Sequence, residues 1–545
     1  MSVNNRFQPG SIHVYKVPFV DSHQAKPRPV LITSLPNSKG DVLGIAGTSQ
    51  IQNWTEENQL IINPDDLISG DLHNPAVFPA SKQMVFSPSF FCGEVGLVNA
   101  KTLEKVLRML VGHQVGQFHD VIRSTKKFVP NGTVIPPSGK VIGANELKSM
   151  VEASLDGWLT TGRFNQQFEK KLAEFLGARF VLTVNSGSSA NLVAVAALTS
   201  SKLGERALKS GDEVISVAAG FPTTVNPLLQ YGLVPVFVDI TLPGYNIDTT
   251  QIEAAISSKT KAIMLAHTLG NPFNLSAVRA LCDKYGLWLI EDCCDALGTR
   301  YDGQLVGGFG DISTLSFYPA HHITMGEGGA VFTNNGKLKK IIESFRDWGR
   351  DCYCAPGQDD SCNNRFGWQL GHLPKGYDHK YTYSHVGYNL KITDMQAACG
   401  LAQLERLDEF IALRKRNFDY LYERLSRYAD WLILPKATPG SEPSWFGFPI
   451  TLKSDLAFNR LALLKFLTAK LIGTRLLFAG NLTRQPYMQD QHYRISGNLK
   501  NTDRVMEDSF WLGVHPALTL EMLDYVAEQI GAFITEHNKN IELSV

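Results

Sequence analysis

Residues 287–329 hold side chains whose types and order suggest chemistry. One apolar run ends in Asp292, a later run ends in Ser316, and Tyr318 and His321 follow the second run closely. In open parallel sheets, ligands bind where strands end and polar residues or glycines follow. An imidazole can move protons near neutral pH, so this stretch predicts acid–base chemistry on a bound ligand.

The segment SFYPAHHITMGEGG, which contains His321, resembles the cofactor-lysine segment of the fold-type I, pyridoxal-phosphate sugar aminotransferases, the DegT/DnrJ/EryC family. In that family a lysine stands where His321 stands here. The lysine would hold pyridoxal 5'-phosphate (PLP) as a Schiff base, which histidine cannot do. The resemblance therefore implies a noncovalent cofactor, most naturally pyridoxamine 5'-phosphate (PMP), with His321 as the catalytic base.

The same resemblance assigns roles to further residues of this chain. Asp292 matches the aspartate that bonds the pyridine nitrogen of the cofactor, and Tyr318 is a third catalytic candidate that positions the substrate or steadies a radical. Phe221 fits the aromatic residue that stacks on the cofactor ring. The candidates for the cofactor phosphate are Ser188, Ser189, Ser316 and, reaching across a homodimer interface, Asn389. The candidates for the sugar and the nucleotide diphosphate are Phe446, Arg475 and Arg484, because the planar fork of arginine suits a diphosphate.

Four of the eight cysteines read Cys294-x57-Cys352-x-Cys354-x7-Cys362. This spacing resembles the [2Fe–2S] motif of the iron–sulfur 3-dehydrases of 4-keto-6-deoxy nucleotide sugars. Four thiolates suit such a cluster, although they could also hold zinc, form disulfides or stay free, and Cys293 could replace Cys294. The polar loop 346–385 would gain from a cluster the cross-links that it lacks.

Together these resemblances imply PMP- and [2Fe–2S]-dependent 3-dehydration of a nucleotide-linked 4-keto-6-deoxyhexose in dideoxysugar and lipopolysaccharide O-antigen biosynthesis. CDP-4-keto-6-deoxyglucose is the first candidate substrate, and an NADH-dependent flavin/iron–sulfur reductase is the expected partner. One alternative is a lysine-free 3-dehydratase that uses no cluster. Another is an RNA-binding or RNA-cleaving module carried on a PLP-fold scaffold.

Length and composition predict a multidomain globular protein. The chain has 545 residues, a formal charge of zero and 44% hydrophobic residues, which gives no general reason to expect nucleic acid or membrane binding. We expect an N-terminal domain over 1–115, a linker over 116–140, a large α/β cofactor domain over 141–410 and a small α/β domain over 411–545. The N-terminus has no apolar signal core, so we expect a cytoplasmic protein.

The N-terminal 115 residues show short β-type runs divided by Pro, Gly and Asn turns. The stretches PGSIHVYKVPF, KPRPVLITS and VLGIAGTSQ resemble the small antiparallel barrel of MazF/PemK-type endoribonucleases. Arg28 and Thr48 match the residues that serve the RNA cleavage site in those toxins. The resemblance implies contact with RNA or DNA. Because the match covers short motifs only and a toxic nuclease is an odd companion for a biosynthetic enzyme, a barrel recruited for docking or regulation is favoured, and an unrelated β domain is the remaining alternative.

Overall fold

The computed structural model describes residues 7–19, 22–53, 58–122, 127–352, 354 and 357–542. Contacts within the chain divide it into two compact units. Residues 1–125 with 143–157 form the first unit, and residues 126–142 with 158–545 form the second.

The first unit is built on an antiparallel sheet of six strands in the order β5-β8-β1-β2-β3-β7. Its strands are β1 (Ser11–Phe19), β2 (Ser22–Ile32), β3 (Val42–Ala46), β5 (Leu67–Gly70), β7 (Gln83–Phe86) and β8 (Phe91–Val98), and a separate pair consists of β4 (Gln59–Ile62) and β6 (Ala76–Pro79). The pairings of the described strands establish the antiparallel sheet but not its closure. The barrel therefore stays a prediction.

Helix α1 (Ala100–Ile122) continues past the predicted boundary at residue 115. Val106 and Leu110 of this helix are buried in the core of the first unit. Arg108 also forms ion pairs with Glu152 and Asp156, at or just beyond the end of α2 (Ala144–Leu155). The polar run after residue 111 suggested a linker, but residues 112–122 contain no proline, and each of their glycines costs a helix only about 1 kcal/mol.

The second unit contains a mixed sheet of eight strands in the order β21-β11-β10-β12-β13-β16-β17-β9. The strands from β21 to β16 run parallel, and β17 is antiparallel to both of its neighbours. Every residue of β10, β11, β13, β16 and β17 is buried, as expected for strands covered on both faces. Their bounds are β9 (Phe180–Val184), β10 (Glu213–Ser216), β11 (Val234–Phe237), β12 (Thr260–Ala266), β13 (Trp288–Asp292), β16 (Ile312–Ser316), β17 (Gly329–Thr333) and β21 (Arg494–Ile495).

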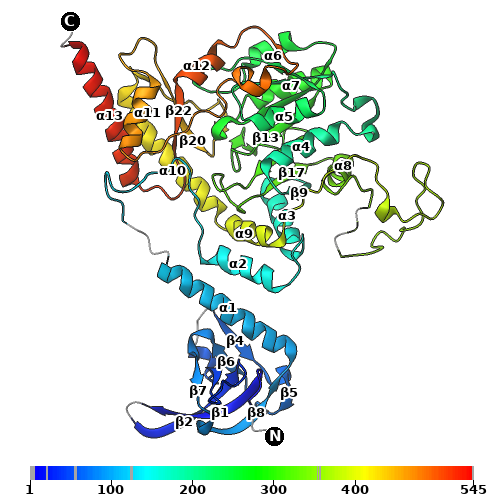
Figure 1. The fold of residues 1–545 in the computed structure, drawn as a ribbon, viewed down its shortest axis with the longest axis vertical. Helices are drawn as coiled ribbons and strands as arrows, with labels where there is room; N and C mark the ends of the chain where they lie inside the picture. The colour runs from blue at the N-terminus through cyan, green and yellow to red at the C-terminus, as the bar shows by residue number, and fades with distance from the viewer. Residues whose placement is uncertain are drawn as a thin grey trace. The chain divides into compact units, whose positions relative to one another are not determined.

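Helices cover this sheet, and Figure 1 shows the strands lying between them. Helix α4 (Gly187–Leu198) packs on β16 and β17, and most of its residues are buried. This burial agrees with its sequence, which consists mainly of small and apolar residues. The other helices around the sheet are α3 (Arg163–Leu176), α5 (Pro222–Gln230), α6 (Thr249–Ala255), α7 (Leu275–Tyr285), α8 (Gly336–Arg346) and α9 (Asp394–Leu404).

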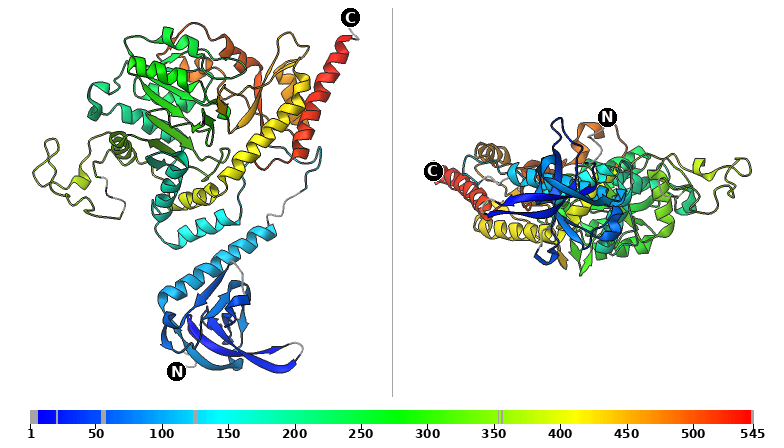
Figure 2. Two further views of the ribbon diagram at one scale, coloured as in Figure 1. Left: turned by 180° about the vertical axis from the view of Figure 1, so that it is seen from behind. Right: turned by 90° about the horizontal axis from the view of Figure 1, so that it is seen from below.

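The C-terminal part of the second unit has its own core. Its sheet has the order β18-β20-β22, formed by β18 (Leu432–Ile433), β20 (Gly447–Leu452) and β22 (Ser509–Gly513). Its helices are α10 (Leu407–Leu425), α11 (Arg460–Ala469), α12 (Lys500–Asp508) and α13 (Leu520–Glu542). Helices α10 and α13 lie side by side in Figures 1 and 2, and α10 runs through the predicted boundary at 410. A small sheet joins β14 (Arg300–Tyr301) to β15 (Gln304–Leu305) and β19 (Ser441–Glu442).

Candidate active site

Two neighbouring parallel strands, β13 and β16, end at the same edge of the large sheet. Asp292 is the last residue of β13, and Ser316 is the last residue of β16. Asp292 pairs in register with Thr314, so both chain ends leave the sheet close together. This edge is where an open α/β sheet is expected to bind its ligand.

The Asp292 carboxylate is buried and held from three directions. Its Oδ2 accepts hydrogen bonds from Asn191 Nδ2 and Thr224 Oγ1, both at 2.8 Å, and its Oδ1 accepts one from the backbone N–H of Cys294 at 3.1 Å. Thr314 Oγ1 donates to Asn191 Oδ1 at 2.7 Å, which turns the amide nitrogen of Asn191 toward Asp292. Donors of this kind stabilise the ionised carboxylate.

The N-terminus of α4 approaches the end of β16. Ser186 caps the helix by accepting from the N–H of Ser189 at 3.0 Å, and Gly187 and Ser188 follow it. A Cβ on Gly187 would lie 2.4 Å from Ser316 Cβ and 3.1 Å from Cys294 Sγ, so only glycine fits here without a shift. Free backbone N–H groups and serine hydroxyls at a helix N-terminus suit a phosphate.

His321 lies in the loop after β16, beside a second buried carboxylate. Its Nδ1 is 3.4 Å from Asp295 Oδ1, and its side chain is only 15% exposed. Burial raises the pKa of the Asp295 carboxyl, and the neighbouring His321 opposes that rise. The next residue, His322, is structural, since its buried Nε2 donates to the carbonyl of Ser444 at 2.7 Å and burial holds its pKa well below the ordinary value.

These groups meet in one cavity of about 1150 Å³. Nine predicted site residues line it, namely Ser188, Phe221, Asp292, Cys294, Ser316, Tyr318, His321, Phe446 and Arg475. Further lining residues that no motif indicated include Asn191, Thr224, Asp295 and Trp511. A weak signal for Asp295 existed, because it follows Asp292 by three residues at a strand end.

Three predicted residues lie elsewhere among the described parts of the chain. Ser189 is engaged in the cap of α4, and Asn389 accepts a hydrogen bond from Lys391 at 2.9 Å. Arg484 pairs with Asp503 at 2.7 Å and with Glu507 at 3.7 Å, so neighbouring carboxylates already compensate its charge. The assignment of Arg484 to the diphosphate stays a prediction, and Arg475 is the arginine that lines the cavity.

The loop 346–385 gathers three of the four motif cysteines. The thiols of Cys352 and Cys354 form a group with His379 in which the ligand atoms lie within 4.8 Å of one another. Cys362 Sγ lies 3.6 Å from His379 Nε2. Burial opposes ionisation of Cys354, but hydrogen bonds from Ser361 and the neighbouring cysteines outweigh it and lower its pKa.

Cys294 stands apart from that group. It lines the cavity of about 1150 Å³ that holds Asp292 and His321, called the cofactor cavity below. Burial together with Asp292 raises the pKa of its thiol well above the ordinary value. The described residues thus do not bring the four predicted cluster ligands together. The four-cysteine set stays a prediction from spacing.

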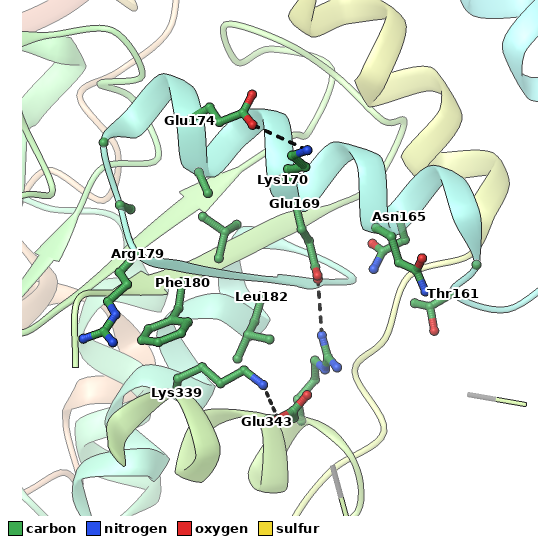
Figure 3. A pocket seen from close by; sticks show the side chains of 17 residues that line it. Thr161, Asn165, Glu169, Lys170, Glu174, Arg179, Phe180, Leu182, Lys339 and Glu343 are labelled. Carbon is green, nitrogen blue, oxygen red and sulfur yellow. Dashed lines mark hydrogen bonds and ion pairs between the residues drawn. The ribbon is translucent and has the colours of Figure 1, made fainter. Parts of the chain in front are cut away.

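A second cavity of about 680 Å³ lies between α3, β9 and α8. Figure 3 shows the ion pairs Lys170–Glu174 and Lys339–Glu343 in this cavity, and Glu169 pairs with Arg346. Most of its charged side chains are therefore already compensated. No predicted site residue lines this cavity. It is therefore a poor candidate for the chemistry.

In the first unit, Arg28 and Thr48 lie at facing positions of β2 and the turn after β3. The N–H of Gly47 donates to the carbonyl of Pro29 at 2.8 Å, so the next residue on each strand faces the other. Arg28 and Thr48 are both partly exposed. Thr48 forms its backbone bridge with Val77, and the joint role of Arg28 and Thr48 stays a prediction.

The sequence matches one protein family over most of the second unit. Residues 140–531 match the DegT/DnrJ/EryC1/StrS aminotransferase family. The chain belongs to this family. The predicted PLP-fold enzyme with an α/β sheet is therefore confirmed, whereas the MazF/PemK likeness and the cluster stay predictions.

Relatives within this family carry names from sugar biosynthesis. The chain is 68% identical over 427 residues to the lipopolysaccharide biosynthesis protein RfbH of Salmonella typhimurium, covering 78% of this chain and 98% of the relative. It is 53% identical over 409 residues to the dTDP-4-dehydro-2,6-dideoxy-D-glucose 3-dehydratase of Saccharopolyspora spinosa, covering 75% and 88%.

Solved structures agree with this placement. A variant of GDP-4-keto-6-deoxymannose-3-dehydratase with bound GDP-perosamine is 28% identical, covers 73% of this chain and 100% of its own, and has a TM-score of 0.66. The Escherichia coli GDP-4-keto-6-deoxy-D-mannose-3-dehydratase with bound hydrated PLP gives the same identity and TM-score, with 73% and 99% covered. In the described part of the chain, no helix is long and apolar enough to cross a membrane.

Proposed function

We propose that the chain is a nucleotide-sugar 3-dehydratase that binds PMP or PLP without a covalent bond. One observation carries the proposal. The cavity that holds Asp292 and His321 has no lysine among the described residues that line it. An amine needed for a covalent cofactor link is thus replaced by an imidazole that can transfer protons.

The two ends of the cavity suit the two polar ends of the cofactor. Asp292 would keep a proton on the ring nitrogen, and Asn191 and Thr224 would hold the carboxylate in place. Ser188, Ser316 and the N-terminus of α4 would bind the phosphate. When bound, PMP supplies an amine for the C4 ketone of the sugar and a ring that withdraws electrons.

His321 would move the protons of the dehydration. It would take a proton from C4' of the cofactor and return a proton to the C3 hydroxyl of the sugar, which leaves as water. The Asp295 carboxylate would orient the imidazole through Nδ1, and Phe446, whose ring centroid is 5.2 Å from that of His321, would cover it. Asp295 would thus act on His321 rather than on the substrate, whereas Phe446 would also line the sugar site.

The substrate is proposed to be a 4-keto-6-deoxyhexose linked to a nucleotide diphosphate. Arg475 lines the cavity, and its Nη1 donates only to the carbonyl of Thr474 among its described side-chain hydrogen bonds, which leaves the guanidinium able to bind a diphosphate. CDP is proposed from the cysteine-motif resemblance, and dTDP and GDP are the nucleotides in the names of relatives. A homodimer, with Asn389 at the partner's phosphate site, is part of the same proposal.

A finer proposal adds a [2Fe–2S] cluster and an NADH-dependent reductase, supported by the spacing of Cys294, Cys352, Cys354 and Cys362. The alternative is a dehydratase without a cluster, which the separate place of Cys294 favours. Iron and acid-labile sulfide in anaerobically purified protein decide between them. Two of each per chain are needed for one [2Fe–2S] cluster.

RNA cleavage through Arg28 and Thr48 is a separate candidate for the first unit.

The mode of cofactor binding can be tested by putting the lysine back. His321→Lys, mixed with PLP and reduced with borohydride, should gain the mass of one covalently bound cofactor, whereas the wild type should not. A wild type that gains the same mass would show that another lysine holds the cofactor.

His321→Asn tests the catalytic role directly. We expect water release from CDP-4-keto-6-deoxyglucose to fall by at least about 10²-fold, because general acid–base catalysis contributes that much, while PMP binding stays unchanged. The exposed loop residue His372 supplies the matched control, His372→Asn. Retained turnover in His321→Asn would remove the base assignment.

A further inference from the structure

The segment 135–141, called the entry segment below, is hydrogen-bonded to the rest of the second unit at both ends. At its start, the N–H of Gly473 donates to the carbonyl of Ile135 at 2.8 Å. At its end, Gln403 Nε2 donates to the carbonyl of Val141 at 2.9 Å. The path of the chain between these two points is therefore anchored on either side.

Three glycines let the middle of the entry segment pack very closely. A Cβ on Gly473 would lie 2.6 Å from Cδ of Pro137, and a Cβ on Gly513 would lie 2.5 Å from the carbonyl oxygen of Pro137. A Cβ on Gly139 would lie 2.6 Å from Cε1 of the buried His515 ring. Side chains at these three positions would push the segment away, so the glycines hold its backbone in one place.

Ser138 lies in the middle of the entry segment and lines the cofactor cavity. The residue is half-buried, and none of the described residues forms a hydrogen bond with its hydroxyl. It precedes residue 140, where the family match begins, and no motif assigned it a role. A hydroxyl without a protein partner, carried by an anchored backbone, is preorganised to bind a ligand.

Ser138 lies between the two parts of the cavity to which the proposed function gives opposite ends of the sugar. On one side, the preceding proline packs on Gly473, two residues before Arg475, the proposed ligand of the diphosphate. On the other side, Gly139 lines a small cavity together with His321, the proposed base. The entry segment thus places Ser138 on the cavity wall between the diphosphate end and the reacting end.

The proposed substrate has a matching order of groups. In a nucleotide-linked 4-keto-6-deoxyhexose, the diphosphate is attached to C1, and the hydroxyl that leaves is on C3. C2 lies between them and carries the only other hydroxyl of the sugar. With the diphosphate at Arg475 and C3 at His321, the C2 hydroxyl faces Ser138. A serine hydroxyl can donate to a sugar hydroxyl and accept from it.

We propose that Ser138 is a substrate-binding residue whose hydroxyl forms a hydrogen bond with the C2 hydroxyl of the sugar. This inference rests on the proposed function, from which it takes the substrate and its orientation. Ser138 contributes to sugar selection, whereas the proton transfers stay with His321. A sugar without the C2 hydroxyl would leave the Ser138 hydroxyl without its partner and would bind more weakly.

The test is a cycle of four dissociation constants. Full-length His321→Asn protein, loaded with PMP, is titrated calorimetrically with CDP-4-keto-6-deoxyglucose and with its 2-deoxy counterpart, CDP-4-keto-2,6-dideoxyglucose. Both titrations are repeated after Ser138→Ala is added. From the usual strength of a hydrogen bond between neutral groups, Ser138→Ala should weaken binding of the first sugar by roughly 3–10-fold and leave binding of the second unchanged.

Two further variants control the cycle. Ser138→Thr keeps a hydroxyl at the position and should preserve the preference for the sugar with the C2 hydroxyl. Ser454→Ala, at an exposed position of the second unit, should bind both sugars like the parent protein. Equal weakening of both sugars by Ser138→Ala, or weakening of neither, would overturn the proposal.

Water release by the wild type, measured separately, distinguishes this inference from the proposed function. Release of water without the predicted preference in the cycle would overturn the role of Ser138 and leave the dehydratase standing. Binding with the predicted preference but no water release would support Ser138 and contradict the dehydratase. A parent protein that binds neither sugar would overturn both.

Discussion

At the scale of single residues, the position of Asp292 depends on neighbours that carry no motif. Asn191 and Thr224 both donate to the same carboxylate oxygen, and Thr314 fixes the amide of Asn191. The carboxylate must stay ionised to hold a proton on a pyridine nitrogen. These donors therefore set how tightly the proposed cofactor binds.

Asn191→Leu tests this dependence, because leucine has a similar volume and cannot donate. A hydrogen bond to a charged group contributes about 1.5–3 kcal/mol, so we expect PMP to bind roughly 10–100-fold more weakly. The measurement is a cofactor titration followed by absorbance, with unfolding by urea as the control for stability. An unchanged dissociation constant would mean that Thr224 and the Cys294 N–H suffice.

At the scale of elements, the buried Arg414 of helix α10 connects the His321 loop with the two residues that precede strand β20. Arg414 is fully buried, and its Nη2 donates to the carbonyls of Ala320 and His321, whereas its Nη1 donates to those of Trp445 and Phe446. The guanidinium thus holds two backbone segments in place, residues 320–321 and residues 445–446, which carry the His321 and Phe446 rings.

Arg414→Met should leave two buried and two partly buried carbonyls without their donor. We expect a loss of about 3 kcal/mol in the free energy of unfolding, of the order measured when a buried polar group loses its partners. Urea unfolding measures this loss, and kcat should fall more than KM changes if the His321 loop shifts. Arg427→Met, at an exposed position just after the same helix, should stay within about 0.5 kcal/mol of the wild type. Equal stability of the two variants would contradict the role of Arg414.

The buried side chain of His515 forms a hydrogen bond with the segment that precedes residue 140, where the family match begins. His515 donates from Nε2 to the carbonyl of Pro136 at 3.1 Å, and burial lowers its pKa to about 4. An unfolded histidine titrates near pH 6.5, so protonation favours the unfolded state as the pH falls from about 6.5 to 4. The stabilisation is complete above pH 6.5 and is lost progressively below it.

His515→Gln replaces the imidazole with an amide that can donate but cannot titrate. Between pH 7 and pH 5 we expect the wild type to lose about 2 kcal/mol more than this variant in its free energy of unfolding. Urea midpoints at the two pH values measure the difference. Parallel losses in both proteins would show that His515 is not buried as a neutral group.

The element scale also explains which site residues the sequence revealed. Asp292, Ser316 and His321 could be predicted because they follow apolar runs, and parallel strands bring such ends to one edge. Asn191 could not, since its contact depends on how α4 packs, and Asp295 gave only the weak signal of its place three residues after Asp292. The spacing of the cysteines indicated a metal ligand set, yet it gave no reason to expect His379 beside Cys362, seventeen residues further along the chain.

At the scale of the whole chain, the proposed chemistry belongs to the second unit alone. The family match begins at residue 140, and every described residue that lines the cofactor cavity lies in the second unit. The match to the RfbH relative covers 98% of that protein but only 78% of this chain. That relative therefore has no counterpart of the remaining part of this chain. Residues 1–125 are therefore expected to be dispensable for dehydration.

Deletion of residues 1–125 should keep kcat and KM unchanged within about twofold, because no cavity residue is removed. Its stability should fall, since residues 143–157 lose the packing of α1 and the ion pairs of Arg108 with Glu152 and Asp156. Deletion of residues 1–115 cuts α1 between Val115 and Gly116 and leaves only residues 116–122 of the helix, without the core that buries Val106 and Leu110. This protein should therefore aggregate more at equal activity per folded molecule. Steady-state assays with CDP-4-keto-6-deoxyglucose and light scattering during heating separate the two effects. A folded but inactive 126–545 chain would mean that the first unit contributes to catalysis, and the search for its role would then begin at Arg28 and Thr48.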